Sequence, residues 1–434
     1  MERQNPASLA AYWKLVRSNR NFRLLWSAQI VSELGDWFYA ISVYSLLLEF
    51  TGSAKSIGLA FVLQVLPQFF VGPTAGVIND RMSRKRVMIL SDLARAGIVL
   101  GMLLVRQPGL EWILYLLLLL ETMMWAFFEP GRNAVIPNIT RGSETLVANA
   151  LSSSTWSVSL AVGSGVGGLV AVFLGRDAVF VLNALSFLVS AALIRRMHFQ
   201  ETHLAEAHPL RARDLTDFSP FLEGVRYIGR DRRLLATLLV KGGLGLMGTN
   251  WVLLPLFGER VFPVALGKLD AARAGMLGMS LLMGSRGVGA LIGPLIASYW
   301  AGQRESRLRL GILLGFLVGA VSYVALALAP SLWAACAAVI LGHAGGSTIW
   351  VFSTTLLQSQ TEDRFRGRVF SADYGIHTLT LSAVSYSAGL GIDLGAGVRT
   401  MAALTGLASL FPAALWSLAL RLWREPAGAR AADS

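Results

Sequence analysis

The chain has 434 residues, of which 54% are hydrophobic and 15% are charged, whereas soluble domains carry about 25% charged residues, so the composition excludes an ordinary soluble domain. Its 38 Lys and Arg residues outnumber its 26 Asp and Glu residues and give a net charge of +12, which basic inner loops of a membrane protein explain without a nucleic-acid partner. The single cysteine, Cys336, excludes an intramolecular disulfide bond and a site built from several cysteines.

Apolar segments recur along the whole chain, each about as long as a helix needs to be to cross a hydrocarbon core of ~30 Å. Twelve of them are predicted to span the membrane, which makes the fold class an all-α membrane protein with twelve transmembrane helices. The residues before the first span show no short apolar segment with a cleavage site, so the first span is expected to act as the insertion signal. In chain order the spans cover residues 22–48, 54–78, 86–105, 112–130, 147–174, 178–195, 234–257, 275–299, 310–329, 332–356, 370–392 and 399–422.

The distribution of basic residues predicts the topology. An even number of spans puts both termini on one side of the membrane. With the N-terminus inside, 28 of the 38 Lys and Arg residues fall in inner segments and 7 in outer loops. Because inner loops carry the excess of basic residues in membrane proteins, we expect both termini to be cytoplasmic and the chain to lie in the cell membrane.

The two halves of the chain carry similar segments at a constant offset. VGPTAGVINDRMSRKR begins at Val71, and IGPLIASYWAGQRESR begins at Ile292. Two parallel repeats of six spans are a transporter architecture. We therefore expect an N-terminal six-helix bundle over 1–195, a cytoplasmic linker over the long polar segment 196–233, and a C-terminal six-helix bundle over 234–434.

A loop of concentrated charge follows the second span and reads GVINDRMSRKRV, residues 76–87. It matches the pattern Gly-x-x-x-Asp-Arg-x-Gly/Ser-Arg-Lys/Arg. At this loop, in the twelve spans and in the polar segment between the halves, the chain resembles the major facilitator superfamily. Two further segments are similar to the drug and siderophore exporter branch, with its macrolide-efflux and enterobactin-exporter proteins: FFEPGRNAVIPNIT (127–140) and LQSQTEDRFRGRVFS (357–371).

The resemblance implies two six-helix bundles that rock around a central site, with a latch at the inner face. Asp80 would accept hydrogen bonds at the start of the eleventh span, where the helix dipole favours an anion. The alternative is that the loop only anchors the inner side through its basic residues. The latch residues that the resemblance implies are Gly76, Asp80, Arg81, Arg84 and Lys85.

Two acids lie near the middle of the first span, where charge is costly and should face a cavity or a partner. Glu33 and Asp36 are three residues apart, which places them on one helical face. We expect them to bind a proton or a cationic substrate. The alternative is a structural role with hydrogen-bonding or ionic partners, for which the candidates are Ser32, Gln29 and Lys241.

Further charged residues fall in other spans. Glu121 in the fourth span is a second candidate for proton coupling or substrate binding, and it needs a partner such as Arg95 or Lys241. Lys241 and Arg286 are the basic candidates, either to neutralise an acid or to bind an anionic substrate. Asp92 and Arg95, near the inner end of the third span, are expected to be structural partners of the charged loop.

Aromatic residues fall in the first, fourth, seventh and tenth spans, which line the cavity in the family that the chain resembles. Their faces suit amphipathic or cationic ligands. His343 and His377 also lie within spans, where they could relay protons or simply be hydrogen-bonded parts of the structure. The predicted cavity aromatics are Trp37, Trp125, Trp251 and Trp350.

These features together predict a monomeric secondary transporter that exports amphipathic small molecules in exchange for protons by alternating access. Its expected partners are the substrate, protons and membrane lipid, with no cofactor and no metal. The fifth span has VGSGVGGLV without the proline of the family's antiporter signature, which weakens the case for antiport. The alternatives are a lipid or lysophospholipid flippase and an uptake facilitator. The chain lacks H-E-x-x-H and G-x-S-x-G motifs, so we do not expect an enzyme.

Overall fold

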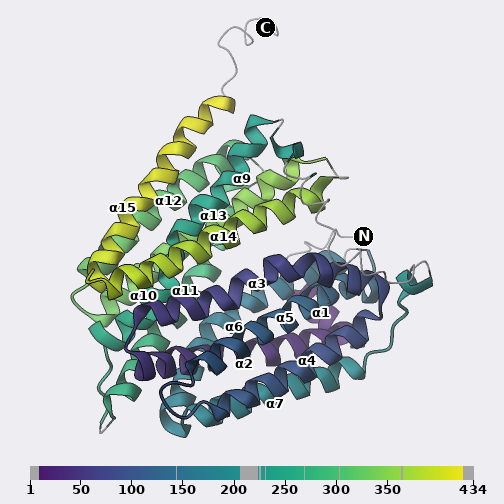
Figure 1. The fold of residues 1–434 in the computed structure, drawn as a ribbon. Coiled ribbons are helices and arrows are strands. Elements are labelled where there is room, and N and C mark those ends of the chain that lie inside the picture. The colour runs from purple at the N-terminus through teal and green to yellow at the C-terminus, as the bar shows by residue number, and fades with distance from the viewer. Residues whose placement is uncertain are drawn as a thin grey trace, which may run out of the picture. The chain divides into compact units, whose positions relative to one another are not determined.

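The computed structural model describes residues 9–142, 144–205, 223, 226–229, 231–267, 269–302, 304–362 and 365–423. This part of the chain is almost entirely helical, as the sequence predicts (Figure 1). The α-helices are α1 (Leu9–Ser18), α2 (Arg20–Thr51), α3 (Ala54–Arg81), α4 (Arg84–Gly101), α5 (Glu111–Ile139), α6 (Glu144–Leu174), α7 (Arg176–Arg195), α9 (Arg232–Gly245), α10 (Asn250–Leu256), α11 (Ala271–Ala301), α12 (Glu305–Leu328), α13 (Leu332–Gln360), α14 (Arg366–Asp393) and α15 (Val398–Ala419).

Ten segments of the described chain are helical, long and apolar enough to cross a membrane. One of them, Arg232–Val261, combines α9, a 3-10 turn, α10 and a turn of π-helix. The other two predicted spans correspond to α2 and α14, which have 32 and 28 residues. Both exceed the roughly twenty residues that a crossing needs, but polar and charged side chains interrupt their apolar surface. The structure thus supports a multi-pass membrane protein, in which ten helical segments qualify as membrane spans by their length and composition.

The helix ends follow from local chemistry. Asn19 caps α2 by accepting a hydrogen bond from the backbone N–H of Phe22 at 2.9 Å. Gly52 ends α2 with φ of 60°, the left-handed conformation that glycine adopts without strain. Ser83 separates α3 from α4 and caps the latter through the N–H of Arg86 at 3.3 Å. The charged loop is therefore a tight connection between two long helices.

The chain divides into two compact units, and each unit contains more than one segment. Unit 1 comprises Met1–Asp217, Trp251–Val288 and Ser385–Gly395. Unit 2 comprises Phe218–Asn250, Gly289–Val384 and Ala396–Ser434. The predicted bundles joined by a linker stay a prediction, and residues 206–222 of that linker lie outside the described residues.

Each unit has its own apolar core. In unit 1, Phe22 and Leu25 of α2 pack with Phe128 and Val135 of α5, and α2 to α7 run alongside one another (Figure 1, purple to blue). In unit 2, α12 packs against α13 and α15. A smaller cluster there joins α9 to α13 and α14, and its members are Ile228, Leu234, Leu238, Leu357, Val369 and Ala372.

Candidate functional site

Arg95 of α4 lies among three carboxylates inside unit 1. Its Nη2 is 2.8 Å from Oδ2 of Asp36 on α2, and its Nε is 2.8 Å from Oε1 of Glu121 on α5. Its Nη1 is 3.7 Å from Oδ1 of Asp92, one helical turn away. The hydroxyl of Tyr39 donates to the other oxygen of Glu121 at 3.4 Å. These four charged residues form the Arg95 cluster, which joins three helices of the unit.

The Arg95 cluster is buried, with one side chain partly open. The side chains of Arg95, Asp92 and Glu121 are 2%, 0% and 7% exposed, whereas that of Asp36 is 24% exposed. Within the described chain, Oδ1 of Asp36 has no hydrogen-bond partner. One guanidinium balances one negative charge, so three ionised carboxylates leave an excess of two in apolar surroundings. Asp36 is the one member of the cluster whose side chain is partly exposed.

The sequence placed two members of this cluster elsewhere. Asp92 and Arg95 were expected beside the charged loop, but Arg95 instead pairs with Asp36 and Glu121. Arg95 lies too far from the charged loop to pair with it. It comes eleven residues after the start of α4 at Arg84, which is roughly 16 Å along the helix axis. Of the two partners proposed for Glu121, the structure confirms Arg95.

Glu33 and Asp36 have different partners although they share a helix. Oε1 of Glu33 accepts a hydrogen bond from Gln29 at 2.8 Å, which is one of the structural partners that the sequence offered. Arg132 of α5 lies within electrostatic reach of Glu33, and its Nε donates to Oε2 of Glu129 at 2.9 Å. Glu129 and Arg132 were not among the predicted site residues, although opposite charges three residues apart in an apolar segment were a usable signal.

Two of the predicted cavity tryptophans stack on each other within unit 1. The rings of Trp37 and Trp251 lie nearly parallel with centroids 6.2 Å apart, and Phe61 stacks on Trp251 at 4.3 Å. Trp156 meets the edge of Trp37 at 5.9 Å. The guanidinium of Arg286 lies 3.5 Å from the centroid of the Trp251 ring, a cation–π contact. We call Trp37, Phe61 and Trp251 the aromatic stack.

Lys241 belongs to a separate polar cluster in unit 2. Its Nζ is 2.5 Å from Oδ2 of Asp373 on α14, and both side chains are at least 96% buried, with 4% and 2% exposed. The ammonium lies 4.1 Å from the centroid of Trp350, and the edge of His377 meets that ring at 5.1 Å. Nδ1 of His377 donates to the carbonyl of Lys241 at 3.0 Å. Lys241, Trp350, Asp373 and His377 form the Lys241 cluster.

The predicted sites are thus distributed over both units. Lys241 is not the ionic partner of Glu33 or Asp36, because it forms an ion pair with Asp373 instead. Asp373 was not among the predicted site residues, although an acid within the predicted eleventh span was a usable signal. Trp125 lies half-buried on α5, outside the aromatic stack.

The charged loop is tied down by two of its basic residues. Nη1 of Arg84 donates to the carbonyl of Ala134 on α5 at 3.1 Å, and Nζ of Lys85 donates to the carbonyl of Met197 at 2.6 Å. Arg81 is half-buried. Asp80 is 72% exposed and lies 3.5 Å from Arg84. The contact of Asp80 with the start of the eleventh span stays a prediction.

Gly76 is another of the predicted latch residues, at the inner end of the second span. A Cβ atom built on Gly76 meets no atom of the described chain within 4 Å. The structure therefore gives Gly76 open space in the present conformation, and its role in the latch also stays a prediction.

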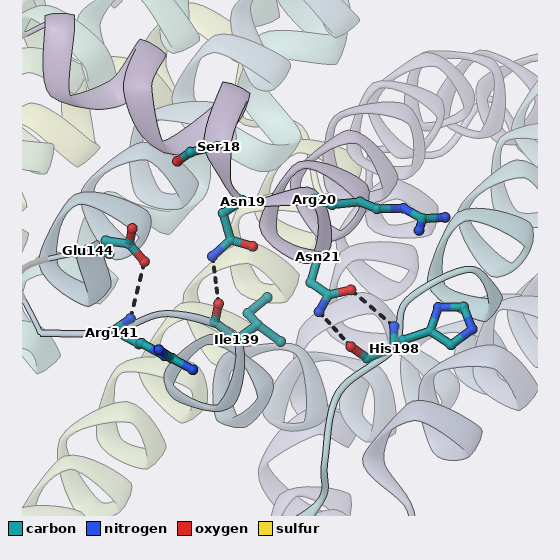
Figure 2. Close-up of a pocket in the computed structure, with 8 residues that line it drawn as sticks. All are labelled: Ser18, Asn19, Arg20, Asn21, Ile139, Arg141, Glu144 and His198. Carbon is teal, nitrogen blue, oxygen red and sulfur yellow. Dashed lines mark hydrogen bonds between the residues drawn. The ribbon is translucent and has the colours of Figure 1, made fainter.

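A polar pocket of about 410 Å³ opens at helix ends of unit 1 (Figure 2). Asn19 and Asn21 line it, and their side-chain amides donate to the carbonyls of Ile139 at 2.6 Å and His198 at 2.7 Å. The remaining lining residues are Ser18, Arg20, Arg141 and Glu144. None of the predicted transport residues lines this pocket, so we assign it no part in the transport site.

Most of the chain matches a model of one protein family. The family model described as "Major Facilitator Superfamily" matches residues 25–372, which include the Arg95 cluster, the aromatic stack and the charged loop. The chain belongs to the Major Facilitator Superfamily. It is therefore a multi-pass membrane transporter rather than an enzyme.

Curated relatives include bacterial transporters of similar length. "Macrolide efflux protein A" of Streptococcus pyogenes is 25% identical over 378 residues, which cover 85% of this chain and 87% of the relative. "Putative bacilysin exporter BacE" of Bacillus subtilis (strain 168) is 24% identical over 352 residues, covering 81% and 83%. These likenesses confirm the resemblance found in the sequence.

Solved structures share the fold. A POT family transporter in complex with a thioalcohol-conjugated peptide has a TM-score of 0.73 and 10% identity, over 93% of this chain and 97% of that chain. A bacterial homologue of the human lysosomal transporter Spinster has a TM-score of 0.68 and 15% identity, over 94% and 100%. At these identities the likeness concerns the fold alone.

Proposed function

We propose that this superfamily member exports amphipathic small molecules from the cell in exchange for protons, by alternating access. The names of its relatives, a macrolide efflux protein and a putative bacilysin exporter, support the direction and the class of substrate. The single structural observation that carries proton coupling is the Arg95 cluster, in which three carboxylates share one guanidinium.

The electrostatics of the Arg95 cluster favour a bound proton. An unbalanced charge inside a membrane protein is costly, and when carboxylates interact this closely each proton lost belongs to the cluster as a whole rather than to one residue. Protonation of Asp36 would remove one excess charge and weaken its contact with Arg95. Because that contact joins α2 to α4, its loss would change how these helices are held.

The aromatic stack and the Lys241 cluster supply candidate substrate contacts. Trp37 and Trp251 are half-buried aromatic rings, and Trp350 lies 36% exposed beside Lys241. A large amphipathic substrate with a hydroxyl, amine or carbonyl suits aromatic rings and polar groups of this kind, which unit 1 offers at the aromatic stack and unit 2 at the Lys241 cluster. Glu33 and Arg286 complete this set as charged groups that a substrate could contact.

The remaining elements of the proposal concern topology and gating. We propose that the transporter is a monomer in the cell membrane with both termini in the cytoplasm, as the distribution of basic residues indicates. Asp80 would close the inner face by capping the start of α14 when the pathway opens outward. Gly76, Arg81, Arg84 and Lys85 would hold the loop that carries Asp80.

Transport into inverted membrane vesicles tests the proposal. With an imposed pH gradient, acid inside, a radiolabelled macrolide antibiotic and a cationic dye should accumulate in the lumen, and a protonophore should abolish the accumulation. Vesicles without the protein are the control. Equilibration without accumulation would overturn proton coupling and indicate a facilitator, whereas movement of a labelled lysophospholipid without a gradient would indicate a flippase.

A further inference from the structure

Asp393, the last residue of α14, caps the N-terminus of α3. Its carboxylate accepts hydrogen bonds from the hydroxyl of Ser53 at 2.5 Å, the N–H of Ala54 at 2.8 Å and the N–H of Lys55 at 3.0 Å. The first N–H groups of a helix have no partner within the helix. Ser53 is the N-cap residue of α3, but its own side chain makes no capping hydrogen bond. A residue about 340 positions away along the chain therefore supplies the cap.

Two glycines bring the backbones of α3 and α14 into contact beside this cap. A Cβ atom on Gly389 would lie 2.6 Å from the carbonyl oxygen of Ala54. A Cβ atom on Gly58 would lie 2.9 Å from the carbonyl oxygen of Ser385. Both distances are too short for a side chain, so the two helices meet here only because both positions are glycine.

A third segment contacts the turn that precedes α3. Nη2 of Arg260 donates to the carbonyl of Gly52 at 2.7 Å. The turn between α2 and α3 is therefore held by Arg260 just after α10 and by Asp393 at the end of α14. We call the contacts of Asp393 and Gly389 with α3 the outer contact, because the predicted topology places Gly52 to Lys55, Arg260 and Asp393 in or beside outer loops.

The ends of α3 and α14 follow the same pattern. α3 carries Gly76-x-x-x-Asp80 directly before its last residue, Arg81, and α14 ends in Gly389-x-x-x-Asp393. The latch implied by the family resemblance brings Asp80 to the start of α14, whereas the structure brings Asp393 to the start of α3. Each helix thus carries, in its last two residues, an acid suited to cap the other helix, one at each face of the membrane.

We infer that the outer contact is a gate that closes the outward pathway, and that Asp393 must leave α3 each time the transporter opens outward. This inference rests on the proposed alternating access and topology. In the present structure the outer contact is made, while Asp80 is 72% exposed and lies near Arg84. The two acids would then cap their helices in alternate states, so that the inner and outer faces are not open together.

Thiol labelling tests the gate without substrate or gradient. Ser385 is fully buried at the outer contact, so Ser385→Cys in a Cys336→Ala background reports its opening to a membrane-impermeant maleimide added from outside. Asp393→Ala should raise the labelling rate by roughly threefold to tenfold, the shift in population that loss of a helix cap brings. Gly389→Ala, which forces the helices apart, should do the same. The matched controls are Asp177→Ala, an exposed acid of another outer loop, and Gly97→Ala, which has open space.

The outcomes separate the gate from the transport proposal. Faster labelling in both test variants and unchanged labelling in both controls would support the gate, even if vesicles show no proton-driven export. Unchanged labelling in Asp393→Ala and Gly389→Ala, with normal amounts of protein in the membrane, would overturn the gate even if export is confirmed.

Discussion

Arg95 and Asp36 form an ion pair between α4 and α2, with Nη2 and Oδ2 2.8 Å apart. The same guanidinium contacts Glu121 of α5 through Nε. A proton that binds to Asp36 would therefore alter a contact between helices as well as a charge. This is how the Arg95 cluster could link protonation to a change in shape.

Neutralising Asp36 should uncouple transport from the pH gradient. We expect Asp36→Asn to lower gradient-driven accumulation of a macrolide in inverted vesicles by more than about tenfold, because the variant offers no carboxylate to exchange the proton. Glu49→Gln, a 45% exposed acid paired with Arg176, is the control and should transport normally. Full accumulation in Asp36→Asn would move proton coupling to another acid, with Glu33 and Glu121 next in order.

Removal of Arg95 should destabilise the protein strongly. Arg95→Ala leaves the carboxylates of Asp36, Asp92 and Glu121 without their cation, and breaking a buried ion pair from one side costs about 3–5 kcal/mol. Thermal unfolding of the purified protein in detergent measures the effect. Asp92→Asn and Glu121→Gln added to Arg95→Ala should restore part of the stability, and failure to restore any would show that packing of the arginine matters more than charge.

Lys241 and Asp373 of the Lys241 cluster should behave as a coupled pair. Lys241→Met and Asp373→Asn should each lower the unfolding temperature, because each leaves an unpaired charge or a lost hydrogen bond in a buried site. The unfolding temperature of the double variant should fall by less than the sum of the two single decreases, since neither charge remains. Additive losses would mean that Lys241 and Asp373 act independently, contrary to their 2.5 Å separation.

The aromatic stack should contribute to substrate affinity more than to turnover. We expect Trp251→Ala to raise the KM for a cationic dye by about 2- to 30-fold, the range of a cation–π contact of 0.5–2 kcal/mol, with a smaller change in maximal rate. Trp112, 61% exposed at the start of α5, provides the control Trp112→Ala. Equal KM values for the two variants would remove the aromatic stack from the substrate site.

Asp393 should not set the pH response of the transporter in the physiological range. Burial raises the pKa of this carboxyl, but hydrogen bonds from Ser53, Lys55 and Ala54 and the charge of Arg260 outweigh it and lower the pKa below its usual 3.8. A group whose pKa is lowered by a contact stabilises that contact above its usual pKa and loses the effect only as the pH falls through the lowered value. The outer contact should therefore persist from pH 5 to pH 8.

The corresponding measurement compares pH midpoints. Labelling of Ser385→Cys, normalised to a fully exposed cysteine, should be faster in Asp393→Asn at every pH between 5 and 8. The pH at which the normalised labelling rate reaches half of its maximum should be the same with Asp393→Asn as in the protein that carries Ser385→Cys alone. A midpoint that moves with Asp393→Asn would show that this carboxylate titrates in the transport cycle.

The sequence predicted the helices well because apolar length is a local property. It also predicted which residues would be costly inside the membrane, since Glu33, Asp36, Glu121, Lys241 and Arg286 can be recognised by charge alone. The α2 and α14 segments, however, contain polar residues that lower their apolar character, which is why composition supports ten spans rather than twelve.

The sequence named Gln29 for Glu33 and Arg95 for Glu121 among its candidate partners, but it did not supply the pairs that join distant helices. Lys241 pairs with Asp373 across 132 positions, and Ser53 meets Asp393 across 340. Such pairs depend on which helices pack together and at what depth, and neither follows from the local pattern. The same limit explains why Arg95 was expected beside the charged loop and was found among carboxylates deeper in the unit.

Proton release by the purified transporter tests the role of the Arg95 cluster most directly. A macrolide antibiotic added to the protein in weakly buffered detergent solution, at a pH where the cluster holds its proton, should release protons that a pH-indicator dye records. The release should disappear in Asp36→Asn and persist in Glu49→Gln. Undiminished release from Asp36→Asn, with macrolide binding retained, would contradict the assignment of the exchanged proton to the Arg95 cluster.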